Sequence, residues 1–261
     1  RISGACRNRH CIGSEVCPNL DTSHEDYRRL LREIRQVPGV KKVFVRSGLR
    51  YDYVLADHNK KFVEELCQYH VSGQLKVAPE HVVKHVTDLM GKADVQAFLK
   101  FKEWFDEANR KLGKKQYLVP YFMSSHPGCT LRDAVELAEF LRDMHMQPEQ
   151  VQDFIPTPGS LSTAMYYTGM NPLTGEKVYV ARRPEEKQMQ RALMQYKNPA
   201  NYDIVYKALC QAGRRDLIGF GPKCLIPPRR LKGAQPERTP QRRGSLQPPK
   251  KTRRRDTRGR K

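Results

Sequence analysis

Three cysteines near the start of the chain, Cys6, Cys11 and Cys17, are the residues with the clearest capacity for chemistry. They form a C-x4-C-x5-C-P spacing that also contains His10. Thiolates this close together suit a structural zinc ion or an iron–sulfur cluster, with the fourth ligand supplied by His10 or an upstream cysteine. The spacing matches no common zinc signature, so a plain loop that contains cysteines is the alternative.

A second group of chemically capable residues follows two short apolar runs. Glu80 and His81 come directly after one run, and they could act in acid–base chemistry or hydrogen-bond a ribose. His126 follows another run and precedes a Pro-Gly pair, which alone would explain a tight turn. For both groups a structural role is the competing interpretation.

Two arginines, Arg46 and Arg50, flank Ser47-Gly48 after a third apolar run. A pair of guanidinium groups can clamp a carboxylate bidentately, although solvated surface arginines are the ordinary alternative. Ligands and catalytic groups of β/α folds gather at the carboxyl ends of the strands. The polar or turn-forming ends here are residues 46–52, 79–81, 124–128 and 156–158.

Four repeats of helix followed by strand position these residues. Core-spaced apolar residues predict helices over 24–36, capped by Thr22 or Ser23, and over 59–69, 94–112 and 131–144. Short apolar runs predict strands over 40–45, 73–78, 115–123 and 150–155. This alternation predicts an α/β fold with a parallel sheet. Periodicity does not distinguish part of a β/α barrel from a small open sheet.

The repeat stops at residue 160, which divides the chain into four predicted segments. Residues 1–23 form a cysteine-rich loop with a candidate metal site, and 24–160 form the β/α part. Residues 161–228 form a small helical region, with a turn-rich loop over 166–172 and helices over 184–196 and 199–212. The remaining segment, 229–261, is a basic tail.

The tail accounts for most of the charge of the chain. Of a net charge of +20 over 261 residues, residues 229–261 contribute +12, which leaves +8 for residues 1–228. The tail has three aliphatic residues and four prolines, so it cannot bury enough apolar surface to fold alone, and we expect it to be disordered. Its lysines and arginines could neutralise RNA phosphates, but it has no aromatic residue to stack on a base.

Composition also indicates where the protein works. The first residue is Arg, which suggests that the true N-terminus lies upstream. No apolar run is long enough to span a membrane, so we expect no membrane partner. Seven cysteines without a secretory signal favour reduced thiols and a cytoplasmic location.

Taken together, these stretches resemble the YgiQ family of radical SAM proteins over roughly residues 6–227. The matching segments are residues 6–21 with the C-x4-C-x5-C-P spacing, VPGVKKVFVRSGLRYD (37–52), GQLKVAPEH (73–81), GKKQYLVPYFMSSHPG (113–128) and QVQDFIPTPGSLSTAMYYTGMNPL (150–173). The resemblance implies a partial radical SAM (β/α)6 TIM-like barrel, of which this chain holds the later four βα units.

The resemblance also implies a cofactor and an activity. Radical SAM enzymes use a [4Fe-4S] cluster to cleave S-adenosylmethionine reductively, and the 5′-deoxyadenosyl radical abstracts hydrogen from a substrate. The C-x3-C-x2-C motif that holds this cluster is not among the seven cysteines here, so we expect its ligands upstream and the fragment alone to be inactive. An electron donor such as flavodoxin or ferredoxin is implied, and the substrate is unknown.

By analogy with such barrels, the later strand ends contact S-adenosylmethionine. The candidates are Ser47, Gly48 and Arg50 for carboxylate or ribose, Lys76, Glu80 and His81 for ribose or substrate, and Tyr121, Ser124 and His126 for the adenine side. Cys6, Cys11 and Cys17 become candidates for an auxiliary iron–sulfur cluster or a zinc site. The alternatives are a nucleic-acid-binding protein or a non-catalytic interaction protein that acts through the basic tail.

Overall fold

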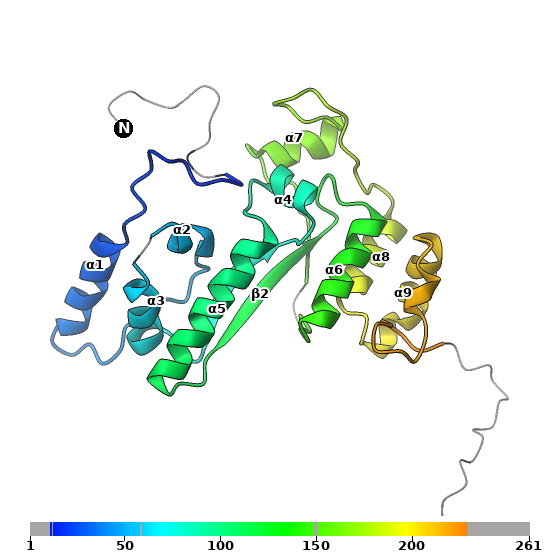
Figure 1. The fold of residues 1–261 in the computed structure, drawn as a ribbon. Helices are drawn as coiled ribbons and strands as arrows, with labels where there is room; N and C mark the ends of the chain where they lie inside the picture. The colour runs from blue at the N-terminus through cyan, green and yellow to red at the C-terminus, as the bar shows by residue number, and fades with distance from the viewer. Residues whose placement is uncertain (1–10, 12, 58, 149–150, 229–261) are drawn as a thin grey trace, which may run out of the picture. The chain divides into compact units, whose positions relative to one another are not determined.

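The computed structural model describes residues 11, 13–57, 59–148 and 151–228. All of them lie in one compact unit, Arg1–Pro228, while Arg229–Lys261 form a second unit that contains the predicted tail. That tail and its predicted disorder therefore lie outside the described residues, as does Cys6. Figure 1 shows the described elements along the chain.

A small parallel sheet is the centre of the fold. It comprises β1 (Gln74–Glu80), β2 (Tyr117–Ser124) and β3 (Gln152–Asp153), in the order β1-β2-β3 with parallel pairing throughout. The expected α/β class and three of the four predicted strands are thereby confirmed. β1 runs two residues further than predicted, through Pro79 to Glu80, and its register with β2 shifts between Val77 and Glu80.

The predicted strand over residues 40–45 is wrong, because the described residues there do not join the sheet. The amide of Val45 donates to the carbonyl of His70, and the His70 ring hydrogen-bonds to the carbonyl of Val43. These bonds tie the segment to a helix end instead of to β1. The parallel bridge between Leu49 and Val77 lies four residues further on.

The four predicted helices of the β/α part are confirmed as α1 (Glu25–Gln36), α3 (Lys61–Glu65) with the π-helix η1 (Leu66–His70), α5 (Val95–Leu112) and α6 (Leu131–Asp143). Capping explains where two of them begin. Asp94 accepts the amide of Gln96 at the start of α5, and Thr130 forms a capping box with Asp133 in α6. The cap of α1 is His24, where Thr22 or Ser23 was predicted.

Two short helices escaped the sequence analysis: α2 (Tyr51–Ala56) and α4 (Lys84–Met90). Each has fewer than eight residues, which is too short to show a helical period.

The region after residue 160 is helical, with α7 (Leu161–Thr168), α8 (Pro184–Met194) and α9 (Tyr202–Gln211), and with short 3-10 turns η2 (Pro199–Asn201) and η3 (Arg215–Leu217). The predicted helices over 184–196 and 199–212 are confirmed. The turn-rich loop predicted from residue 166 is wrong for its first three residues, which belong to α7. Ser160 caps that helix and Gly169 ends it with a φ of 69°.

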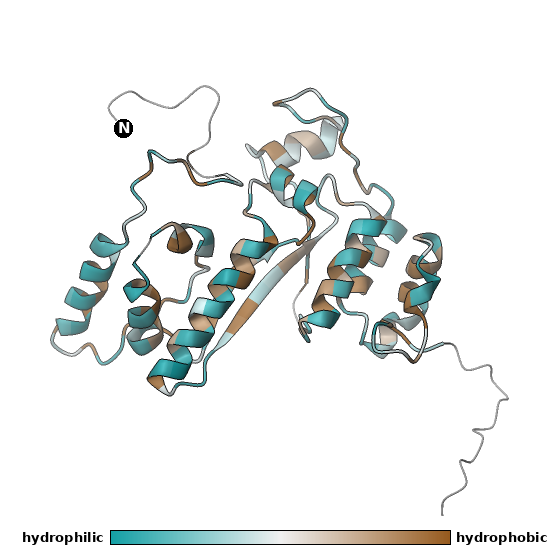
Figure 2. Ribbon diagram, viewed as in Figure 1, coloured by the Kyte–Doolittle hydropathy of each residue, from teal (hydrophilic) through white to brown (hydrophobic). Residues whose placement is uncertain are grey.

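Two hydrophobic clusters hold the helices against the sheet. One contains Leu75 and Val77 of β1 with side chains of α2, α3 and α5, and the other contains Phe122 of β2 with side chains of α6, α8 and α9. Hydrophobic and polar residues alternate along α6, as expected of a helix with one buried face (Figure 2). The sequence-based boundary at residue 160 therefore runs through one cluster, since α6 and α8 share it.

Candidate functional site

The polar residues that follow β1 and β2 lie together in the structure. Because the strands are parallel, Glu80 and His81 end β1 at the same edge of the sheet where Ser124, Ser125 and His126 end β2. We call this set of residues the carboxyl edge. His81, Ser124, Ser125 and His126 are all buried, at 1–3% exposure. The sequence had indicated this gathering, but not that its histidines are enclosed.

The His81 ring joins the two strand ends. Its Nδ1 accepts the amide of Val83 at 3.1 Å, so the ring proton sits on Nε2, which lies 3.4 Å from the sulfur of Cys129. Burial lowers the pKa of His81 to about 4 and raises that of the Cys129 thiol. At neutral pH both groups are uncharged, and both ring nitrogens of His81 are occupied.

His126 is held in the opposite tautomer. Its Nδ1 lies 2.7 Å from the carbonyl of Pro127 and must donate to it, so Nε2 accepts the hydroxyl of Ser162 at 2.8 Å. Burial lowers the pKa of His126 to about 4. The contact with Ser162 ties the end of β2 to α7.

The two serines after β2 have opposite hydrogen-bonding situations. The Ser124 hydroxyl donates to Asp153 at 2.5 Å, and the other carboxylate oxygen of Asp153 pairs with Arg191 of α8 at 3.1 Å. Ser125 has a φ of 61°, and its buried hydroxyl has no partner among the described residues. Its amide donates to the side chain of Gln190, whose own amide donates to the carbonyl of Cys129.

Glu80 stands at the end of β1 in a left-handed conformation, with a φ of 64°. Its carboxylate pairs with Lys92 at 2.7 Å, and both side chains are about one-fifth exposed. A non-glycine residue in this conformation carries strain of order 1 kcal/mol or more, which other contacts must offset. Such positions are common at functional sites, and here the ion pair with Lys92 holds the conformation.

The three candidate residues of the loop before α2, Ser47, Gly48 and Arg50, differ in whether they line a cavity. Gly48 and Arg50 line a cavity of about 130 Å³ next to Lys92, whereas the exposed Ser47 does not line it. Arg50 binds Asp52 bidentately, at 3.0 and 2.6 Å, and this pairing raises the pKa of its guanidinium. Arg50 therefore has its carboxylate partner within the chain.

A larger cavity of about 840 Å³ lies beside the same arginine. Arg50, Cys17 and Ser162 line it, together with residues of α4 and α7. The loop that contains Cys17 is tied down by the hydroxyl of Tyr53, which donates to the carbonyl of Cys11 at 2.7 Å. The cysteine segment thus lies close to the carboxyl edge through Ser162, which hydrogen-bonds to His126.

The face of the sheet opposite the helices carries polar, aromatic and aliphatic side chains. Because side chains alternate along a strand, Leu75, Val77 and Phe122 face the helices and the intervening residues face away. We call Gln74, Lys76, Tyr117, Val119 and Tyr121 the open face. They line a depression of about 500 Å³ together with residues 118, 120, 122 and 146–148, and the Lys76 ammonium lies 5.7 Å from the Tyr121 ring centre.

The predicted metal site is described only in part. Among the residues that the structure describes, which include Cys11 and Cys17 but not Cys6, no three His, Cys, Asp or Glu residues lie close enough to hold a metal ion. A three-cysteine site remains a prediction.

Several residues that complete these groups had not been singled out from the sequence. They are Lys92, which pairs with Glu80; Gln190, which bridges Ser125 and Cys129; and Asp153, which accepts from Ser124. Asp153 and Gln190 lie 29 and 65 residues from their serine partners, so no local motif could reveal them. Across the described segments, none of the helices is both long and apolar enough to cross a bilayer.

Comparison with known proteins shows that this chain is similar in sequence to part of several longer proteins. It is 59% identical over 223 residues to a UPF0313 protein of Clostridium perfringens, 56% identical over 225 residues to one of Methanocella arvoryzae, and 55% identical over 224 residues to one of Clostridium botulinum. These matches cover 85–86% of the chain but 34–37% of the relatives, so the chain spans about a third of their length.

A family model for a domain of unknown function, DUF3362, matches residues 149–260. This segment contains α7, α8 and α9 together with residues outside the described part. Over 85–86% of its length, the chain is similar in sequence to these UPF0313 proteins.

Proposed function

We propose that this chain is part of a radical SAM enzyme, in which the parallel sheet is one section of the barrel wall and its open face points to the cofactor. The single observation that carries the proposal is the asymmetry of the sheet. Helices pack on one face through hydrophobic side chains, while the other face carries Lys76 and Tyr121 over a depression of about 500 Å³. A barrel wall has this asymmetry, with helices outside and ligands at the carboxyl edge.

The open face offers side chains that can bind two parts of S-adenosylmethionine. The Lys76 ammonium has no carboxylate within ion-pair distance among the described residues, so it is available for the carboxylate of the methionine part. The Tyr121 ring beside it offers a surface on which adenine can stack. When bound to a reduced iron–sulfur cluster, S-adenosylmethionine supplies radical chemistry; this chain contributes positioning.

The buried histidines then act as positioning residues. His81 and His126 are neutral, and each has both ring nitrogens engaged by the protein, so neither is available to a ligand in this conformation. Their bonds fix the loops that follow β1 and β2. Enclosed and uncharged groups at the carboxyl edge would also keep water away from a reactive intermediate.

We propose that the ligands of the iron–sulfur cluster lie in sequence upstream of this chain. The curated relatives extend well beyond the matched segment, which is about a third of their length. Reading the gene upstream of residue 1 is the first test, and the proposal requires a C-x3-C-x2-C motif in the same frame. A complete reading frame without that motif would end the enzyme hypothesis.

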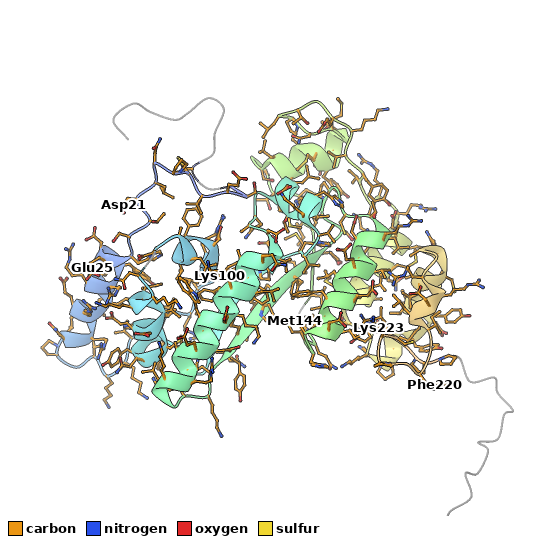
Figure 3. All side chains as sticks on the ribbon, viewed as in Figure 1. Asp21, Glu25, Lys100, Met144, Phe220 and Lys223 are labelled. Carbon is orange, nitrogen blue, oxygen red and sulfur yellow. The ribbon has the colours of Figure 1, made fainter. Side chains whose placement is uncertain are left out.

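The direct test uses the protein from the complete reading frame, reconstituted with iron and sulfide without oxygen. With dithionite and S-adenosylmethionine, we expect formation of 5′-deoxyadenosine. Lys76→Met should weaken S-adenosylmethionine binding by about tenfold, because a charged hydrogen bond is lost. Lys100→Met, on α5 and so on the helical side of the sheet, should leave binding unchanged (Figure 3).

The two results separate two kinds of error. If the wild-type protein produces no 5′-deoxyadenosine, the proposed function is wrong. If it does so and the Lys76 variant binds normally, only the assignment of the open face is wrong.

A further inference from the structure

A groove at the opposite edge of the sheet is lined by cations. Gly73 and Gln116 directly precede β1 and β2, so the groove that they line lies at the amino ends of these strands. We call it the basic groove, and its volume is about 480 Å³. Its lining includes five basic side chains and no acidic one; the five are Arg35, Lys41, Lys42, Lys114 and Lys115.

The charge of the groove is not compensated nearby. Among the described residues, no carboxylate lies within ion-pair distance of Arg35, Lys41, Lys42 or Lys115. The acidic residues closest along the neighbouring helix are already engaged: Glu65 by Arg28 and Arg32, and Glu64 by Lys111. Unpaired cations in a concave surface concentrate positive potential and attract a polyanion.

Hydrogen bonds hold two of the residues that line the groove in place. Lys114 donates to the carbonyls of Cys67 and Gln68, and the Gln116 side chain donates to the carbonyls of Cys67 and Val71 at 2.9 and 3.0 Å. These bonds satisfy carbonyls at the end of η1 and hold the start of β2 against it. Lys114 is therefore structural, while the exposed Lys41, Lys42 and Lys115 remain available to a ligand.

Two aromatic rings stand among these cations. The Arg35 guanidinium lies 3.6 Å from the centre of the Tyr69 ring and covers one face of it. Phe44 also lines the groove, and both rings are 40% exposed. In the described part of the chain, no cation or second ring stacks on Phe44. Exposed rings between lysines are the arrangement that binds unpaired bases beside a phosphate backbone.

We propose that the basic groove binds single-stranded nucleic acid, with Lys41, Lys42 and Lys115 on the phosphates and Phe44 stacked on a base. An acidic protein surface would also be drawn to the cations, but it would give the exposed aromatic ring no stacking partner. All residues of the site belong to the unit Arg1–Pro228, and none belongs to residues 229–261. It does not depend on the proposed radical chemistry, since the carboxyl edge is at the other end of the strands.

The test measures binding of a short fluorescent oligouridylate to the full chain by anisotropy. The variant Lys41→Gln/Lys42→Gln/Lys115→Gln removes three cations from the groove. The matched control, Lys100→Gln/Lys177→Gln/Lys197→Gln, removes three exposed lysines elsewhere, and both variants keep the tail. The groove variant should bind at least tenfold more weakly than the control, and its log–log salt slope should be lower by about 2.

The ring is tested separately from the charges. Phe44→Ala should weaken binding about fivefold or more, whereas Phe44→Tyr should restore it, because a tyrosine ring also stacks. Circular dichroism checks that each variant is folded. If the groove variant and the lysine control bind alike, the groove does not hold the polyanion and the proposal fails.

A competition experiment decides between classes of partner. Polyglutamate should displace the oligouridylate poorly, because it has no bases to stack. Equal displacement by polyglutamate, together with no effect of Phe44→Ala, would show an acidic-protein site and overturn the proposal.

Discussion

The two ends of one small sheet show opposite ways of using polar residues. At the carboxyl edge, His81, Ser124 and His126 are buried, and each is hydrogen-bonded within the protein. At the amino end, Lys41, Lys42 and Lys115 are exposed and have no carboxylate partner among the described residues. The first arrangement fixes backbone geometry at a cost in desolvation, and the second leaves charge available to a partner.

The difference shows why residue type alone is a weak guide to role. Histidine is the residue most associated with catalysis, yet both histidines here are enclosed and neutral. Surface lysine is usually dismissed as solvated, yet three of these lysines share one groove. What separates the two cases is whether the polar atoms are already satisfied.

Acidification should have the largest effect on the stability of the carboxyl edge, because the two histidines take up protons more readily in the unfolded state than in the folded state. Their pKa values fall from an ordinary 6.5 to about 4 on folding, so the folded state favours the neutral ring. The stabilisation is present above pH 6.5 and is lost as the pH falls towards 4. The expected loss is roughly 3 kcal/mol for each histidine, measured by urea unfolding across this range.

The matched variant is His81→Asn/His126→Asn, which keeps polar side chains at both positions without the imidazole charge. Its stability should depend less steeply on pH between 6.5 and 4 than that of the wild type. Parallel curves would mean that carboxylates alone account for acid unfolding.

Substitution of Gly128, two residues beyond the carboxyl edge, should have the next largest effect. Gly128 has a φ of 94°, its amide donates to the carbonyl of Tyr179, and a Cβ there would clash with Leu89. We expect Gly128→Ala to cost about 2–3 kcal/mol. Gly159→Ala is the control, because Gly159 has a φ of 81° with open space around it, and it should cost only about 1 kcal/mol of backbone strain.

Thermal unfolding of the two glycine variants gives the comparison directly. Equal losses would show that Leu89 moves aside easily, and that the carboxyl edge is less rigid than its hydrogen bonds suggest.

The neighbouring serines should respond in opposite directions. Ser124→Ala leaves Asp153 without its hydroxyl donor and should destabilise the fold by about 1–2 kcal/mol. Ser125→Ala removes a buried hydroxyl that has no partner among the described residues, so it should be neutral or stabilising by up to about 1 kcal/mol. Urea midpoints at neutral pH test the pair, and a loss at Ser125 that matched the loss at Ser124 would indicate an unseen partner.

The smallest effect is expected at the amino end. Lys41→Gln/Lys42→Gln/Lys115→Gln should change the stability by less than about 0.5 kcal/mol, because these side chains hold nothing within the described fold. A clear loss in calorimetry would show that the groove lysines are structural, and the contrast between the two ends would disappear.

Much of the fold could be predicted from the sequence because its helices are long and periodic. α5 and α6 have clear caps and apolar stripes, and β1 and β2 are short apolar runs that precede polar residues. The run at 40–45 misled because Val43 and Val45 are apolar but hydrogen-bond to His70 instead of to a strand. A periodicity argument cannot show which backbone partner a segment chooses.

The candidate site could be located but not interpreted from the sequence. The polar strand ends marked the correct edge of the sheet, since parallel strands bring their carboxyl ends together. The His126 ring is held by Ser162 of α7 and the neighbouring Ser125 by Gln190 of α8, partners that lie more than thirty residues away in the sequence. The sequence therefore predicted the position of these residues, whereas their burial and hydrogen bonds follow from tertiary packing.

The bridge made by Gln190 has a practical consequence for how this protein can be divided. The homology-defined segment begins at residue 149, yet Gln190 from α8 closes the turn between Ser125 and Cys129. A piece expressed from residue 149 onward would leave this glutamine facing water and strip α6 from the cluster it shares with α8 and α9. The segment matched by the family model and the folded unit therefore have different boundaries, and the boundaries of an expressed fragment should follow the folded unit.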